Sequence, residues 1–138
     1  WSPLAAGRLG GKYGRNKPMP TDSRVAQGGS PVPEAVVNEA IFYNITDTLD
    51  EVVEETGKSV AQVALNWLLQ RPTVANIIIG ARNEEQLKQN LDAVGWNLTI
   101  EQVRKLDKAS DVPTIYPYWH QRQNLKLNPI PDFYHQQK

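Results

Sequence analysis

The sequence predicts an α/β protein, and three observations support this prediction. A loop rich in Gly, Ala and Ser opens the chain at residues 1–13. Two apolar helical patterns follow, at residues 34–56 and 60–71. The short β-branched run VANIIIG, residues 74–80, then has the composition of a strand buried on both faces, as in a parallel sheet. The expected order of elements is loop, helix, helix, strand, helix, helix and tail.

The opening loop, WSPLAAGRLGGKY, has the composition of a ligand-binding loop. Its small residues let backbone N–H groups approach a ligand closely, and Lys12 adds a charge that attracts phosphate. Such a loop normally follows a core strand. We therefore expect the chain to be the C-terminal part of a larger enzyme, beginning at its cofactor loop. Residues 14–33, with several prolines, are predicted to form a long irregular loop of the functional or mobile kind.

Two helices should follow this loop. The first, at about 34–56, ends at Gly57, and Ser59 with Gln62 reads as a capping box for the second, at 60–71. The second helix is apolar on most sides, which predicts deep burial, and Pro72 ends it. One apolar stripe at helical spacing defines the first helix: Ile41, Ile45, Leu49, Val52 and Val53.

Two further helices are predicted after the strand. Asn83 and Gln86 form a capping box for a helix that runs to Val94, with Gly95 as its stop. A last helix runs from Thr99 to about Ala109. We divide the chain into a segment at 1–110 and an irregular tail at 111–138.

The junction at Gly80-Ala81-Arg82 has the chemistry of an anion site. It places free N–H donors, the positive end of a helix dipole and a guanidinium between a strand and a helix. Its helix carries a polar stripe whose amides suit the edge of an adenine or a ribose phosphate. An ordinary solvent-exposed stripe is the alternative, and spacing alone favours it. The stripe consists of Arg82, Gln86, Gln89 and Asn90.

The composition excludes several classes of function. The formal net charge is 0, from 15 basic and 15 acidic residues, so neither nucleic acid nor a membrane surface is an expected partner. The chain has no cysteine, hence no thiolate ligand, and a cytoplasmic location is expected. Its apolar runs are too short to cross a bilayer. His120 and His135 lack companions at metal-ligand spacing, so no metal site is predicted.

Three ordered segments resemble the C-terminal part of aldo-keto reductases: WSPLAAGRLGGKY, SVAQVALNWLLQRP and IIIGARNEEQLKQN. The branch that is most similar contains bacterial oxidoreductases and the β subunits of voltage-gated potassium channels. The resemblance, over about residues 1–110, implies part of a (β/α)₈ barrel, from the end of strand seven through helix eight, with NADP(H) lying across the carboxyl ends of the strands. An isolated piece of this kind would be mostly helical.

The resemblance also implies a set of cofactor-binding residues. Trp1 would stack on the nicotinamide, Arg24 would reach the cofactor phosphates, and Gly80 with Arg82 would hold the 2′-phosphate. Gln86, Gln89 and Asn90 match contacts on the adenine side, although a Glu is common in the family where this chain has Gln89. The pyrophosphate would be lined by the loop residues Ser2, Pro3, Leu4, Ala5 and Ala6, with Lys12 nearby.

The family reduces aldehydes or ketones by hydride transfer and takes its Tyr, Lys, Asp and His from earlier strands. We assign no catalytic residue in this chain. The alternative is a non-catalytic interaction or assembly module, or an inactive barrel fragment. The helices at 34–56 and 60–71 carry apolar faces suited to packing on a sheet. We therefore expect the isolated chain to self-associate, through 74–80 or 60–71, or to bind the rest of its barrel.

Overall fold

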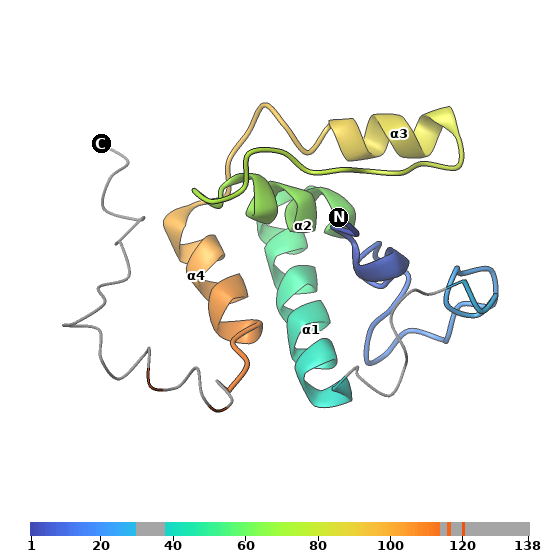
Figure 1. Cartoon of the computed structure of the whole chain (residues 1–138), viewed down its shortest axis with the longest axis horizontal. Coiled ribbons are helices and arrows are strands. Elements are labelled where there is room, and N and C mark those ends of the chain that lie inside the picture. The colour runs from blue at the N-terminus through green and yellow to red at the C-terminus, as the bar shows by residue number, and fades with distance from the viewer. Residues whose placement is uncertain (30–37, 114–115, 117–119, 121–138) are drawn as a thin grey trace.

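The computed structural model describes residues 1–29, 38–113, 116 and 120. These residues form a helical assembly in which α1 and α4 lie side by side and α2 crosses one end of the pair (Figure 1). Residues 34–37 of the first predicted helix, and most of the tail from Asp111, lie outside the described residues. The helices are the short 3₁₀ turn η1 (Ala5–Gly7), α1 (Glu39–Thr56), α2 (Val60–Leu69), α3 (Glu84–Leu91) and α4 (Ile100–Ala109).

Local capping explains where α1, α2 and α4 begin and end. The Asn38 side chain accepts a hydrogen bond from the Ile41 N–H and starts α1, and Gly57 ends it at a φ of 67°, a left-handed conformation that favours glycine. The predicted capping box between Ser59 and Gln62 is confirmed at the start of α2. The box between Thr99 and Gln102 is confirmed in the same way at the start of α4.

The core lies where α1, α2 and α4 meet. Leu49 and Val52, from the predicted apolar stripe, are buried in α1, whereas the other stripe residues are half-buried. The expectation that the apolar faces of the first two helices await a sheet is therefore wrong in part, because they pack on each other and on α4. Deep burial of α2 holds for its central residues, and its other apolar side chains are half-buried. The core cluster consists of Leu49, Val52, Val63, Ala64, Leu98, Val103 and Leu106.

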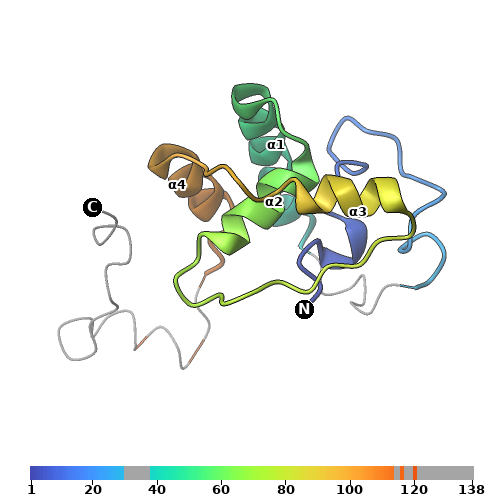
Figure 2. The same ribbon diagram turned by 90° about the horizontal axis from the view of Figure 1, so that it is seen from above.

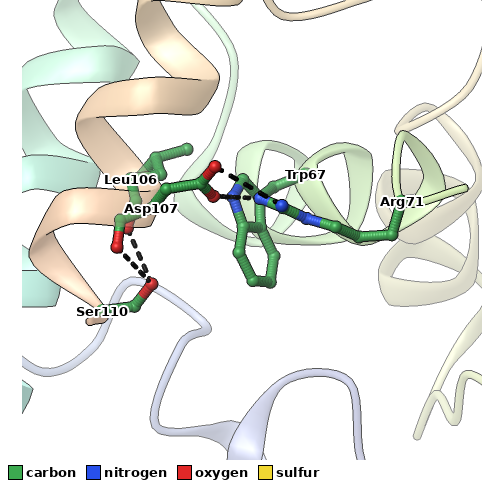
Figure 3. Close-up of polar contacts among 5 residues, drawn as sticks. All are labelled: Trp67, Arg71, Leu106, Asp107 and Ser110. Carbon is green, nitrogen blue, oxygen red and sulfur yellow. Dashed lines mark hydrogen bonds and ion pairs between the residues drawn. The ribbon is translucent and has the colours of Figure 1, made fainter. Parts of the chain in front are cut away.

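A polar cluster joins the end of α2 to α4 (Figure 3). The Arg71 guanidinium lies 3.9 Å from the Trp67 ring centroid and forms an ion pair with Asp107. Asp107 also accepts a hydrogen bond from Trp67 Nε1 at 2.9 Å. Trp67 is thus half-buried against the core, and its indole N–H has a hydrogen-bond acceptor. A buried tryptophan usually finds such a partner for its N–H group.

The predicted strand at 74–80 is wrong for the described residues, which contain no β-strand. The segment is extended and runs beside α3 (Figure 2), but it has no ladder of hydrogen bonds to a neighbouring strand. Its expected burial on both faces is also wrong, because the Ile78 side chain is 69% exposed while Ile77 and Ile79 are half-buried. A β-branched run supplies the extended backbone, but only a partner strand can complete a sheet.

The helix α3 is shorter than predicted and presents a different face to the core. It ends at Leu91, and turns rather than helix lead on to Gly95. Its apolar side chains Leu87 and Leu91, with Val94 beyond the helix end, are exposed. The polar Asn90 and the small Ala93 are buried instead. Gln62 and Asn66 of α2 donate to the carbonyls of Gln89 and Ala93, at 3.1 and 2.9 Å, and so hold this face against α2. No helix among the described residues is long and apolar enough to cross a membrane.

Candidate cofactor site

The opening loop is anchored to the helical core. Leu4 and Leu9 pack against the core cluster. The Leu4 carbonyl accepts hydrogen bonds from the N–H groups of Gly7 and Leu9, at 2.9 and 3.1 Å. At Gly11, with a φ of 89°, an added Cβ would lie 3.4 Å from the Val60 Cβ. The loop therefore runs in close contact with the start of α2, and its small residues permit that approach.

Three residues of this loop adopt a backbone conformation that is costly for residues other than glycine. Ser2, Ala5 and Ala6 have φ values of 51°, 49° and 60°. Conformations of this kind persist only where the surrounding contacts impose them, and they concentrate at ligand-binding segments. All three are among the residues that the resemblance places along a pyrophosphate. Pro3, between the first two of these, is half-buried.

Residues 13–17 attach the loop to α1. Lys17 Nζ lies 2.9 Å from an Asp50 carboxylate oxygen, and Arg15 Nε lies 3.0 Å from Asp47 Oδ2. The buried Tyr13 hydroxyl donates to Ser23 Oγ at 2.6 Å, which connects the start of the long loop to its middle. These contacts position Lys12, and the sequence pattern did not single out their acidic partners on α1.

Lys12 forms an ion pair with Asp22, and the charge of Arg82 acts weakly on the pKa of the same carboxyl. Lys12 Nζ donates to Asp22 Oδ2 at 2.6 Å. This hydrogen bond and the Lys12 charge lower the pKa of the Asp22 carboxyl, and the charge of Arg82 lowers it further. Figures 1 and 2 both show the loop of residues 1–29 and the N-terminal end of α3 on the same side of the molecule. The two cations that sequence reasoning assigned to phosphate thus lie on the same side of the molecule.

The polar stripe of α3 is only partly available to a ligand. Gln86 Oε1 accepts from the Arg82 N–H at 2.8 Å, and the Gln86 N–H donates to Asn83 Oδ1. The predicted capping box is therefore correct in its first half only, because the Gln86 side chain reaches Arg82 instead of Asn83. Asn90 is buried, and its Nδ2 donates to the Gly80 carbonyl at 3.3 Å. Gln89 is exposed.

Two predicted site residues stand apart from this group. The Trp1 side chain is 84% exposed. Arg24 is also exposed, and its carbonyl accepts from the Gly29 N–H at 2.9 Å, which closes a turn in the long loop. The structure thus pairs Lys12 of the opening loop with Asp22, which sequence reasoning missed. Within the described residues, no group of three His, Cys, Asp or Glu could hold a metal ion.

Comparison with known proteins identifies the family of this chain. The family model described as "Aldo/keto reductase family" matches residues 1–111. An L-glyceraldehyde 3-phosphate reductase of Escherichia coli K12 is 39% identical over 102 residues, which cover 72% of this chain and 29% of that protein. A probable voltage-gated potassium channel subunit beta of Oryza sativa subsp. japonica is 38% identical over 115 residues, or 78% of this chain and 33% of that protein.

A third relative is the chloroplastic pyridoxal reductase of Arabidopsis thaliana, 32% identical over 113 residues, which cover 80% of this chain and 27% of that protein. The chain spans about a third of the length of these curated relatives. The family match extends over most of the chain and includes the opening loop, α2 and the junction before α3. This chain therefore belongs to the aldo/keto reductase family.

Proposed function

We propose that this chain is the cofactor-binding part of an NADP(H)-dependent oxidoreductase that reduces aldehydes or ketones by hydride transfer. The observation that carries the proposal is that the loop of residues 1–29, in which Lys12 pairs with Asp22, lies on the same side of the molecule as the start of α3, where Arg82 precedes the helix (Figures 1 and 2). Two cations beside a loop of small residues suit a ligand with several phosphate groups. Relatives named as reductases support the same activity.

The proposed role of each segment follows from its chemistry. Residues 2–6 line the pyrophosphate with the Lys12 ammonium beside it, and Arg82 binds the 2′-phosphate. The exposed Trp1 indole is free to stack on the nicotinamide, and Gln89 reaches the adenine side. NADP(H) supplies the hydride. The proton donor comes from the part of the relatives that this chain does not span, so we assign no catalytic residue here.

A chimera tests the cofactor assignment. Residues 1–111 replace the matching segment of the E. coli L-glyceraldehyde 3-phosphate reductase, and NADPH and NADH are titrated while Trp fluorescence is followed. NADPH should bind more tightly. Arg82→Ala should remove about ten-fold of that preference, toward the low end for a charge-assisted hydrogen bond because Arg82 is exposed. Arg104→Ala, at an exposed arginine of α4, is the matched control and should leave the preference unchanged.

Activity gives a second readout of the same chimera. It should oxidise NADPH in the presence of 4-nitrobenzaldehyde, whereas this chain alone should not, because loss of a general acid costs on the order of 10²–10⁴-fold. Equal affinity for the two nucleotides would contradict the assignment of the 2′-phosphate to Arg82. Enzyme-like turnover by the isolated chain would contradict the assignment of the proton donor to the missing part.

Exposed apolar side chains favour a second candidate, an assembly module. Ile78 of the predicted contact segment, Leu87 and Leu91 of α3, and Val94 beyond its end are exposed, whereas the apolar residues of α2 are buried or half-buried. Self-association or binding to the remaining barrel would cover them. Sedimentation velocity over a concentration series tests this role. A single monomeric species at all concentrations, with no partner added, would rule it out.

A further inference from the structure

Asp22 occupies an unusual position among the acidic residues near the candidate site. Its carboxylate accepts a hydrogen bond from Lys12 Nζ at 2.6 Å, and its pKa is lowered by Lys12 and, less strongly, by Arg82. Lys12 follows the opening loop and Arg82 precedes α3. The carboxylate therefore pairs with the cation to which the proposed function assigns the pyrophosphate.

The other acidic partners of this loop serve a different purpose. Asp47 and Asp50 belong to α1, so their pairs with Arg15 and Lys17 attach the loop to a packed helix. Asp22 belongs to the long loop itself, and its side chain is 71% exposed. The pair that it forms with Lys12 contributes little to attaching the loop to the core. Asp22 can also turn away without leaving a buried charge behind.

A carboxylate and a phosphate need the same donors. The Lys12 ammonium offers three N–H donors from a compact charge, and oxygen atoms of either anion can accept from them. While Asp22 accepts at 2.6 Å it neutralises the Lys12 charge and takes one donor. A phosphate group that approaches Lys12 therefore meets both a partly engaged cation and the repulsion of a neighbouring carboxylate.

We propose that Asp22 is a specificity-determining residue: an internal anion that competes with ligand phosphates for Lys12, so that only a ligand with several negative charges displaces it. This inference rests on the proposed function for the identity of the natural ligand, but the competition itself is a property of Lys12 and Asp22. Asp22 lowers the affinity for all phosphates by the same factor, so weakly charged ones, whose own affinity for Lys12 is low, no longer occupy it.

The test uses the 138-residue chain and inorganic pyrophosphate. Binding is measured from NMR shifts of the backbone amides of residues 4–12, with circular dichroism to verify that each variant is folded. Asp22→Asn should bind pyrophosphate about two- to five-fold more tightly than the wild type, the range expected for an exposed ion pair. Asp47→Asn is the matched control, because it removes the same charge and releases an exposed cation of the same loop. It should bind as the wild type does.

A double variant separates the proposed competition from a general charge effect. In the background of Lys12→Met, the Asp22→Asn substitution should bring no gain, because the cation for which Asp22 competes is gone. Equal gains from Asp22→Asn and Asp47→Asn, or a gain that survives Lys12→Met, would overturn the proposal. Weaker binding by Asp22→Asn would also overturn it and would make Asp22 a strap over the ligand. The proposal is also overturned if neither the wild type nor any variant binds pyrophosphate.

These results are distinguishable from a failure of the proposed function. The pyrophosphate titration involves neither a nicotinamide nor a carbonyl substrate. If Asp22→Asn gains affinity while the chimera shows no preference for NADPH, the competition stands and the cofactor assignment fails. If the chimera prefers NADPH while Asp22→Asn gains nothing, the cofactor assignment stands and the role of Asp22 fails.

Discussion

Replacement of Asn66 should lower the free energy of unfolding substantially, although the asparagine side chain is small. Asn66 lies in the middle of α2 and is 2% exposed. Its Nδ2 donates to the carbonyls of Ala93 and Trp96, at 2.9 and 2.8 Å. Its Oδ1 accepts from the Leu98 N–H at 3.1 Å and from Gln70 Nε2 at 2.6 Å. The amide therefore uses both donors and both acceptor positions and fixes the connection between α3 and α4.

The magnitude follows from these four hydrogen bonds. Each contributes roughly 0.5–1.5 kcal/mol net, and a buried backbone group left without a partner costs about 1–3 kcal/mol. Asn66→Ala leaves the Leu98 N–H and the Ala93 carbonyl in that state, although relaxation of the connection recovers part of the loss. We expect a loss of about 3–4 kcal/mol in the free energy of unfolding, near the upper end for single substitutions.

Urea unfolding followed by Trp fluorescence measures this loss, with an unchanged m-value as the sign that only stability has changed. Asn97→Ala, at an exposed asparagine of the same connection, is the control and should remain within about 0.5 kcal/mol of the wild type. Hydrogen exchange at the Leu98 amide should be faster in Asn66→Ala. A loss below about 1 kcal/mol, or unchanged exchange at Leu98, would refute the reasoning.

Asn66→Asp extends the same prediction to pH. The new carboxylate can accept from Leu98 but cannot donate to Ala93 or Trp96, and burial raises the pKa of its carboxyl in the folded state. A raised folded-state pKa means that the folded chain binds more protons than the unfolded chain. The penalty of the substitution is therefore full at neutral pH and shrinks as the pH falls below the folded-state value. The urea midpoint of Asn66→Asp should lie below that of the wild type at pH 7. At pH 5 the two midpoints should be closer together.

Two further predictions concern the contacts of α4. Lys105 and Gln102 donate to Glu55 and lower the pKa of its carboxyl, so their contribution to stability is present above about pH 4.5 and is lost as the pH falls through the lower folded-state value. Thermal melts of Lys105→Met should differ from the wild type at pH 7 and approach it at pH 3. Asp107→Asn should keep the acceptor for Trp67 and lose the half-buried ion pair with Arg71, at a cost of about 1 kcal/mol. A melting temperature equal to that of Glu101→Gln, an exposed control on the same helix, would contradict this.

The helices were predictable because their signals are local. The side chains that cap α2 and α4 lie within three residues of the groups they satisfy, and Gly57 ends α1 through its own backbone conformation. The apolar stripe of the first helix likewise identified Leu49 and Val52 as core residues. The orientation of α3 was not predictable in this way. It depends on Gln62 and Asn66 of α2, which donate to the backbone around Gln89 and Ala93.

The candidate site was predictable in its parts and not in its assembly. Small residues and a lysine identified the opening loop. A helix start directly after an arginine identified the junction at Gly80-Ala81-Arg82. Nothing in the local sequence places Lys12 near Arg82, and that placement followed from the resemblance alone. Asp22 was missed because a single aspartate in a long loop has no periodicity, and its significance comes from the cations around it.

The segment at 74–80 shows why one half of the site does not require a sheet. It remains extended without a partner strand because the Asn90 amide binds the Gly80 carbonyl at 3.3 Å and Gln86 caps the Arg82 N–H at 2.8 Å. Asn90 is fixed in turn because α2 donates to the backbone on both sides of it, through Gln62 and Asn66. Helix contacts, rather than strand pairing, therefore position Arg82 relative to α2. The opening loop is packed on that same helix through Gly11 and Val60. Both halves of the proposed phosphate site are thus held against α2, so this chain can be tested directly for pyrophosphate binding.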